Sequence, residues 1–212
     1  MSIKFNYLKK TINKPTGNIV LFSNEKFKTN EFKKYLSNFE FSYINDLLKN
    51  ADLKKNLYIF ELSSKRNIIL VSIKKDLKIS DIEKLGAEFF GRINIGDSKD
   101  YFIISDTINY KNNNFLSHFL HGAKLKSYVF KKYKTKKEKR DITLNITGNK
   151  NKPSIQNQIK FKALEEGTFY ARDLVSEPGN VLHPDEYAKR LSSLKKDGLK
   201  INIYDEKKLK KM

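Results

Sequence analysis

Short apolar runs alternate with amphipathic stretches through residues 1–151, and this alternation restricts the fold more than any other feature of the sequence. Compact apolar runs between turn-forming residues are typical of buried strands, and apolar residues three and four apart are typical of helices. Interleaved strands and helices predict an α/β fold with a mixed sheet flanked by helices. The expected strands are Ile3–Leu8, Asn18–Phe22, Leu57–Leu62, Ile68–Ile73, Asp100–Ser105, Ser127–Tyr133 and Asp141–Thr147.

Three helices are expected between these strands. The first covers Ser42–Leu53, the second begins with a capping box formed by Ser80 and Glu83, and the third is capped by Asn114. The short polar segment at residues 63–67 predicts that its two flanking strands form a hairpin.

The segment after residue 151 has a different organisation. Turn-forming residues at 148–153 indicate a domain boundary, and a long helix is expected from Ser154 to Val175, with Ile155 and Ile159 on its buried stripe. A helix at Pro184–Lys196 and a strand at Leu199–Tyr204 should follow. One strand and two helices cannot bury a core, so residues from about 170 onward are interpreted as the beginning of a domain.

The charge balance is strongly basic, with a formal net charge of +19 at pH 7. Such a surplus raises nucleic acid or an anionic membrane as a partner. However, all but five of the 43 basic residues are lysines, whereas phosphate recognition favours the planar fork of arginine. We therefore attribute the surplus mainly to biased composition.

The sequence has no cysteine, so disulfides and thiol chemistry are excluded. Its first residues lack the apolar core of a signal peptide, and no apolar run has the length of a membrane span. We expect a soluble, cytoplasmic protein without a membrane partner.

Two blocks of sequence resemble the leucyl aminopeptidase (cytosol aminopeptidase) family. The first, at residues 122–137, is similar to the family's small-residue helix end followed by a Tyr-Lys-Thr-Lys segment. The second, at residues 166–184, contains the Ala-Arg-Asp-Leu-Val helix end from Ala171 to Val175, a Pro-x-Asn turn at Pro178–Asn180 and a helix opened by Pro184. The layout is similar throughout the chain, and the resemblance is strongest from about residue 118 to residue 188.

The resemblance implies a macro-domain-like, non-catalytic N-terminal domain at residues 1–151 and a linking helix at 152–176. Residues 177–212 would then be the beginning of an α/β catalytic domain that is truncated in this chain. It further implies a parent enzyme that removes N-terminal amino acids from peptide substrates, uses two divalent metal ions (Zn or Mn) and forms a hexamer. In that enzyme the present segment would serve oligomerisation and access to the active site. The family's metal-binding Lys, Asp and Glu residues would follow Met212, so we assign no catalytic, metal or substrate-binding residue here and predict that this chain alone is inactive.

Other features allow alternative interpretations. His118 and His121 could place two metal ligands on one helix face. We expect instead that both are polar residues at the surface or at the helix end, without an acidic partner. His183 is expected to be a turn residue. The basic run Lys131–Arg140 could bind nucleic acid weakly, which would suit a free-standing nucleic-acid-binding module, although we favour a solvated loop. Relatives of the macro-domain fold bind ADP-ribose, but the sequence contains no glycine-rich phosphate loop.

Overall fold

The computed structural model describes residues 2–95, 99–111, 114–135 and 141–212. The chain divides into two compact units, Met1–Glu166 and Gly167–Met212. This boundary falls inside the long helix α4 (Ile155–Ser176).

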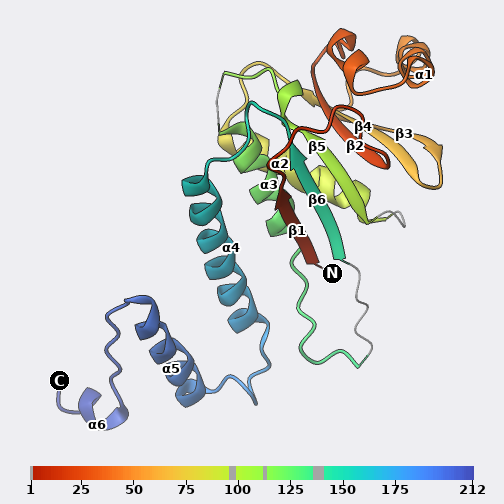
Figure 1. Cartoon of the computed structure of the whole chain (residues 1–212). Helices are drawn as coiled ribbons and strands as arrows, with labels where there is room; N and C mark the ends of the chain where they lie inside the picture. Colours follow the sequence, from red (N-terminus) through yellow and green to blue (C-terminus); the bar gives the residue numbers. More distant parts are fainter. Residues whose placement is uncertain (1, 96–98, 112–113, 136–140) are drawn as a thin grey trace. The chain divides into compact units, whose positions relative to one another are not determined.

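A six-stranded sheet forms the centre of the first unit, within the described residues (Figure 1). Five of the strands run parallel to one another. The sixth, the edge strand β3, runs antiparallel to its neighbour β4, with which it forms the predicted hairpin. In spatial order the strands are β1 (Ser2–Tyr7), β6 (Asp141–Thr147), β5 (Asp100–Ile104), β2 (Asn18–Asn24), β4 (Arg66–Ile73) and β3 (Leu57–Ser63).

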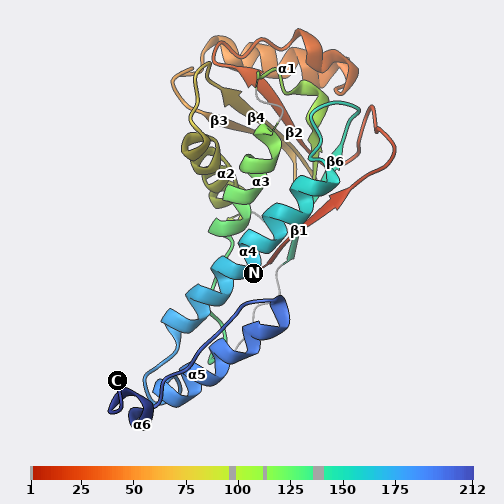
Figure 2. The ribbon, with the colours of Figure 1, turned by 90° about the vertical axis from the view of Figure 1, so that its left-hand side faces the viewer.

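Helices cover both faces of the sheet and make three layers (Figure 2). Val20 and Phe22 of β2 pack with α2 (Ile79–Ile93) and α3 (Phe115–Lys126). Ile19 and Leu21, which point to the opposite face, pack with α1 (Asn38–Lys49) and the short 3-10 helix η1 (Asn30–Lys34). Both sides of β2 are therefore buried, which explains its continuous apolar run. The predicted mixed α/β fold is confirmed.

Two glycines let α2 and α3 approach each other closely. A Cβ atom at Gly86 would lie 1.9 Å from the carbonyl oxygen of Phe119, and one at Gly122 would lie 1.9 Å from that of Glu83. No side chain fits at such distances, so this helix pair requires glycine at both positions.

The second unit contains the end of α4, the helix α5 (Pro184–Ser193) and two short elements, η3 (Leu194–Asp197) and α6 (Glu206–Leu209). Gly198 ends η3 with a positive φ of 85°, a left-handed conformation that glycine adopts without strain. None of the described helices is long and apolar enough to cross a membrane.

Two predicted strands are wrong, because residues 127–133 and 199–204 are irregular and take no place in the sheet. A strand needs a neighbour for its backbone hydrogen bonds. Both edges of β6 are already paired, with β1 and β5, and the second unit has no strand among its residues, all of which are described.

Two helix starts also differ from the prediction. The first helix begins at Asn38 rather than Ser42, because Ser37 and Glu40 form a capping box that the prediction overlooked. The expected box of Ser80 and Glu83 does not form. Instead, the carboxylate of Asp81 accepts a hydrogen bond from the backbone N–H of Lys78.

Candidate functional site

The two histidines of α3 each contact a carboxylate from a different helix. His118 Nδ1 lies 3.0 Å from Glu83 Oε1 on α2, and His121 Nδ1 lies 3.2 Å from Glu165 Oε1 on α4. His121 is buried. The expectation of surface histidines without acidic partners is therefore wrong, and the reason is tertiary: Glu83 and Glu165 are 35 and 44 residues away in sequence.

Phe161 of α4 packs against both histidine rings. Its ring centroid lies 4.9 Å from that of His118, edge to face, and 5.0 Å from that of His121. Phe161 and Glu165 are one helical turn apart and are the two buried residues of α4. The predicted stripe is wrong on this point, since Ile155 and Ile159 are 74% and 65% exposed.

Glu165 also influences two other ionisable groups. Burial, reinforced by the negative charge of Glu165, raises the pKa of Tyr7 to about 12. Burial lowers the pKa of Lys124, and the carboxylate of Glu165 opposes this effect. The Lys124 ammonium donates a hydrogen bond of 2.7 Å to the backbone oxygen of Ile3.

We call His121, Phe161, Glu165, Tyr7 and Lys124 the α4 anchor. It joins α4 to α3 through His121, Phe161 and Glu165, and the charge of Glu165 also acts on Tyr7 of β1 and Lys124 of α3. Buried ionisable groups are retained mostly where they are paired, and the His121–Glu165 pair satisfies that condition. The chemistry of the α4 anchor is that of a docking contact, because its carboxylate, Glu165, is paired with His121 inside the anchor.

A second polar cluster closes the carboxyl edge of the sheet. Open α/β sheets bind ligands at this edge, where neighbouring strands lead to opposite faces, as β2 and β5 do here. Asp106 Oδ1 accepts hydrogen bonds from the backbone N–H groups of Asn149 and Lys150, at 2.7 and 2.6 Å. Gly148 has a φ of 137°, and a Cβ there would lie 2.3 Å from Ser105 Oγ. The protein's own residues thus fill this part of the edge.

In the second unit, Arg190 of α5 connects three segments. Its guanidinium contacts Glu177 at 2.8 Å and Glu186 at 3.0 Å, and its backbone oxygen accepts a hydrogen bond from the Tyr170 hydroxyl. The Glu177 side chain is only 1% exposed. This network holds the end of α4, the following turn and α5 together, and two of its residues, Tyr170 and Glu177, lie in the second block that resembles the family.

The remaining predicted residues have plain structural positions. His183 precedes α5 as its N-cap without a side-chain cap, and Pro184 occupies the first turn, as predicted. Of the basic run, Lys131–Thr135 is irregular, and Tyr133 packs against Phe130 at 5.8 Å between ring centroids. Residues 136–140 lie outside the described residues.

The described residues do not fit a metal centre. No group of three or more His, Cys, Asp or Glu side chains converges among them in a way that could hold an ion. His118 and His121 point to separate carboxylates and share no common ligand position. We therefore derive no catalytic step through a metal in this chain.

Solved structures show which class of fold this is. A mutant of tomato leucine aminopeptidase superposes with a TM-score of 0.73 over 99% of this chain and 46% of its own, at 18% sequence identity. The bottromycin maturation enzyme BotP in complex with Mn superposes with a TM-score of 0.63 over 93% of this chain, at 13% identity. The chain therefore has the mixed α/β fold found in leucine aminopeptidase.

Curated relatives narrow the assignment further, although no family model matches the chain. A probable cytosol aminopeptidase of Methylorubrum extorquens is 38% identical over 99 residues, which are 44% of this chain and 20% of the relative. That of Nitrobacter winogradskyi is 32% identical over 158 residues, which are 68% of this chain and 30% of the relative. Over the part that it spans, the chain belongs to the leucyl aminopeptidase family.

Proposed function

We propose that this chain is the N-terminal part of a metal-dependent leucyl aminopeptidase that removes N-terminal amino acids from peptides in the cytoplasm. In this proposal residues 1–151 form the non-catalytic domain, residues 152–176 the linking helix, and residues 177–212 the beginning of the catalytic domain. The relatives are named cytosol aminopeptidases, and the comparisons do not favour the alternative of a free-standing nucleic-acid-binding module.

One observation carries the proposal that the catalytic centre is missing from this chain. The matched segments account for only 20% and 30% of two curated relatives. The proposed pair of Zn or Mn ions would then be held by residues that are not among these 212. The role of this chain would be structural: the α4 anchor fixes one end of α4 to the first domain, and the Arg190 network organises the segment that follows α4.

An activity measurement tests this division. The purified 212-residue chain, supplied with Mn²⁺ or Zn²⁺, should not hydrolyse leucine p-nitroanilide above the rate of the metal alone. Metal-dependent hydrolysis that is lost on chelation would contradict the proposal. Sequencing beyond the Met212 codon provides an independent test, since the proposal requires the reading frame to continue into a region rich in Lys, Asp and Glu.

The proposed role in oligomer formation has support on the outer face of α1. Phe39, Tyr43 and Leu47 follow one another at helical spacing and are 74%, 39% and 41% exposed, and the rings of Phe39 and Tyr43 stack at 6.2 Å. Copies of a chain with a charge of +19 repel each other. The only lysine of α1 is Lys49, its last residue, and it pairs with Asp46. We therefore propose a second copy of this chain as the occupant of this face.

Sedimentation equilibrium of matched variants tests the α1 contact. Leu47→Ser should weaken self-association by about tenfold, the effect of losing roughly 1.4 kcal/mol at an interface. Leu53→Ser is the control, because Leu53 is equally exposed, at 42%, but follows α1. A wild-type chain that is monomeric at all concentrations, or equal effects of the two substitutions, would rule out α1 as the contact.

A further inference from the structure

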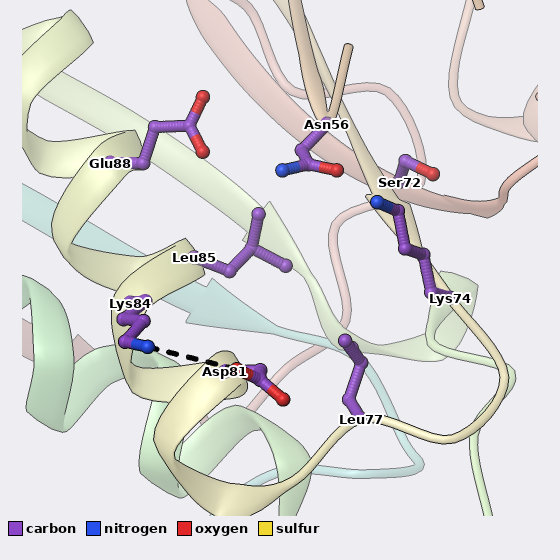
Figure 3. A pocket seen from close by; sticks show the side chains of 8 residues that line it. All are labelled: Asn56, Ser72, Lys74, Leu77, Asp81, Lys84, Leu85 and Glu88. Carbon is purple, nitrogen blue, oxygen red and sulfur yellow. Dashed lines mark ion pairs between the residues drawn. The ribbon is translucent and has the colours of Figure 1, made fainter. Parts of the chain in front are cut away.

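A pocket of about 330 Å³ lies beside the first turns of α2, and none of its lining residues belongs to the α4 anchor. Asp81, Lys84, Leu85 and Glu88 line it from α2, and the other lining residues are Asn56, Ser72, Lys74 and Leu77. Figure 3 shows Leu85 between the polar residues of the two walls. The volume is at the lower end of the range of about 300–1,000 Å³ that small-molecule sites occupy, which favours a small ligand.

The pocket contains charges of both signs that the protein leaves available. In the part of the chain that the structure describes, the side chains of Lys74 and Glu88 make no hydrogen bond or ion pair. Lys84 has only a long contact of 4.0 Å with Asp81, whose other carboxylate oxygen already accepts from the backbone of Lys78. One ammonium and one carboxylate, on opposite walls, are thus free to bind ligand groups of opposite charge.

Apolar side chains form the rest of the surface. Leu85 is 6% exposed and belongs to the core, and Leu77 packs against the same core. The Asn56 side chain, which makes no hydrogen bond among the described residues, can both donate and accept one. The pocket therefore combines two opposite charges, one amide and an apolar floor.

We propose that this pocket binds a free amino acid with an apolar side chain. Lys74 would bind its carboxylate, Glu88 its ammonium group, and Leu77 and Leu85 would contact its side chain. A phosphate-bearing ligand fits less well, because the carboxylates of Asp81 and Glu88 would repel it and no arginine lines the pocket. This proposal goes beyond the proposed peptidase role, since binding requires only residues of this chain.

Ligand analogues test the charge requirement on the wild-type chain. Titration calorimetry with L-leucine should give saturable binding in the millimolar range. L-leucinamide, which lacks the carboxylate, and N-acetyl-L-leucine, which lacks the ammonium group, should each bind at least tenfold more weakly. Equal binding of N-acetyl-L-leucine would reveal general attraction of anions to a basic chain and would overturn the proposal, as would the absence of leucine binding.

Variants then test the location of the site. Lys74→Met and Glu88→Gln should each weaken leucine binding about tenfold, while Lys75→Met and Glu31→Gln, at exposed positions outside the pocket, should leave it unchanged. Circular dichroism spectra should be the same for all four, because none of these side chains is buried. If the two pocket variants bind leucine as the wild type does, the site lies elsewhere and the assignment fails.

Discussion

The two units of this chain are held together by different means. In Met1–Glu166, the sheet and its helices bury two apolar clusters that extend over both faces. In Gly167–Met212, all of whose residues are described, no residue is buried as a whole, although the side chain of Glu177 is only 1% exposed. The second unit depends instead on the contacts of Arg190 with Glu177 and Glu186. Regular helices form in both units, but only the first has the packed interior that normally stabilises them.

Truncation of one side chain in each unit should give the largest contrast. Phe119→Ala removes a ring that is fully buried between the sheet and α2, and we expect a loss of about 3–5 kcal/mol in the free energy of unfolding. Leu199→Ala, at a position 54% exposed in the second unit, should change it by less than about 0.5 kcal/mol. Urea unfolding followed by circular dichroism measures both, and comparable losses would show that the second unit has a core of its own.

The same glycine substitution should have opposite signs in the two units. Gly122→Ala places a methyl group against the backbone of Glu83, which forces α2 and α3 apart and should cost about 1–3 kcal/mol. Gly167→Ala, with open space around it in the helix α4, should stabilise by up to about 1 kcal/mol. Thermal unfolding of the two variants makes the comparison, and a neutral Gly122→Ala would mean that the helices are less closely packed than described.

The α4 anchor should make the first unit sensitive to alkaline pH. Because the pKa of Tyr7 is raised to about 12 in the folded chain, the unfolded chain, with a tyrosine pKa near 10, loses this proton first. The corresponding stability is present below about pH 10 and is lost as the pH rises through about 12. Tyr7→Phe should therefore show a smaller fall in urea midpoint between about pH 9 and about pH 11. Parallel curves for the two proteins would contradict the assigned environment of Tyr7.

The smallest and most local effect is expected in the second unit. Arg190→Met removes the contacts with Glu177 and Glu186 while keeping an apolar stem of similar length. We expect faster hydrogen exchange at the amides of α5 and no change at those of β2, because β2 belongs to the other compact unit. Glu186→Gln is a milder control, since it leaves the Arg190–Glu177 contact intact. Slower or unchanged exchange in α5 would show that this network does not organise the unit.

Much of the first unit could be predicted because its strands are buried on both faces. The run Ile19–Phe22 has no polar residue, so composition alone identified it, and the hairpin followed from two such runs and a short polar segment. The failures occurred where a partner was needed. Residues 127–133 and 199–204 have strand periodicity, but periodicity cannot show whether a free edge is available to pair with.

The α4 anchor was not predictable for a related reason. The apolar residues Ile155 and Ile159 suggested the wrong face of α4, and the true contact combines Phe161 with an acidic residue, Glu165. The buried carboxylate of Glu165 is stabilised by its contact with His121, and the two residues are 44 positions apart in the sequence. The spacing of Phe161 and Glu165, one helical turn, was the only local signal available.

The loop after β6 has a consequence for how this fold should respond to small molecules. In many α/β proteins the carboxyl edge of the sheet forms an open ligand-binding crevice, and the folded protein is stabilised when a nucleotide binds there. Here Gly148, Asn149 and Lys150 occupy part of that edge, and Asp106 accepts hydrogen bonds from the backbone N–H groups of Asn149 and Lys150. Because the loop already fills this part of the edge, a nucleotide has little room to bind there. The melting temperature of the chain should therefore not change when nucleotide is added.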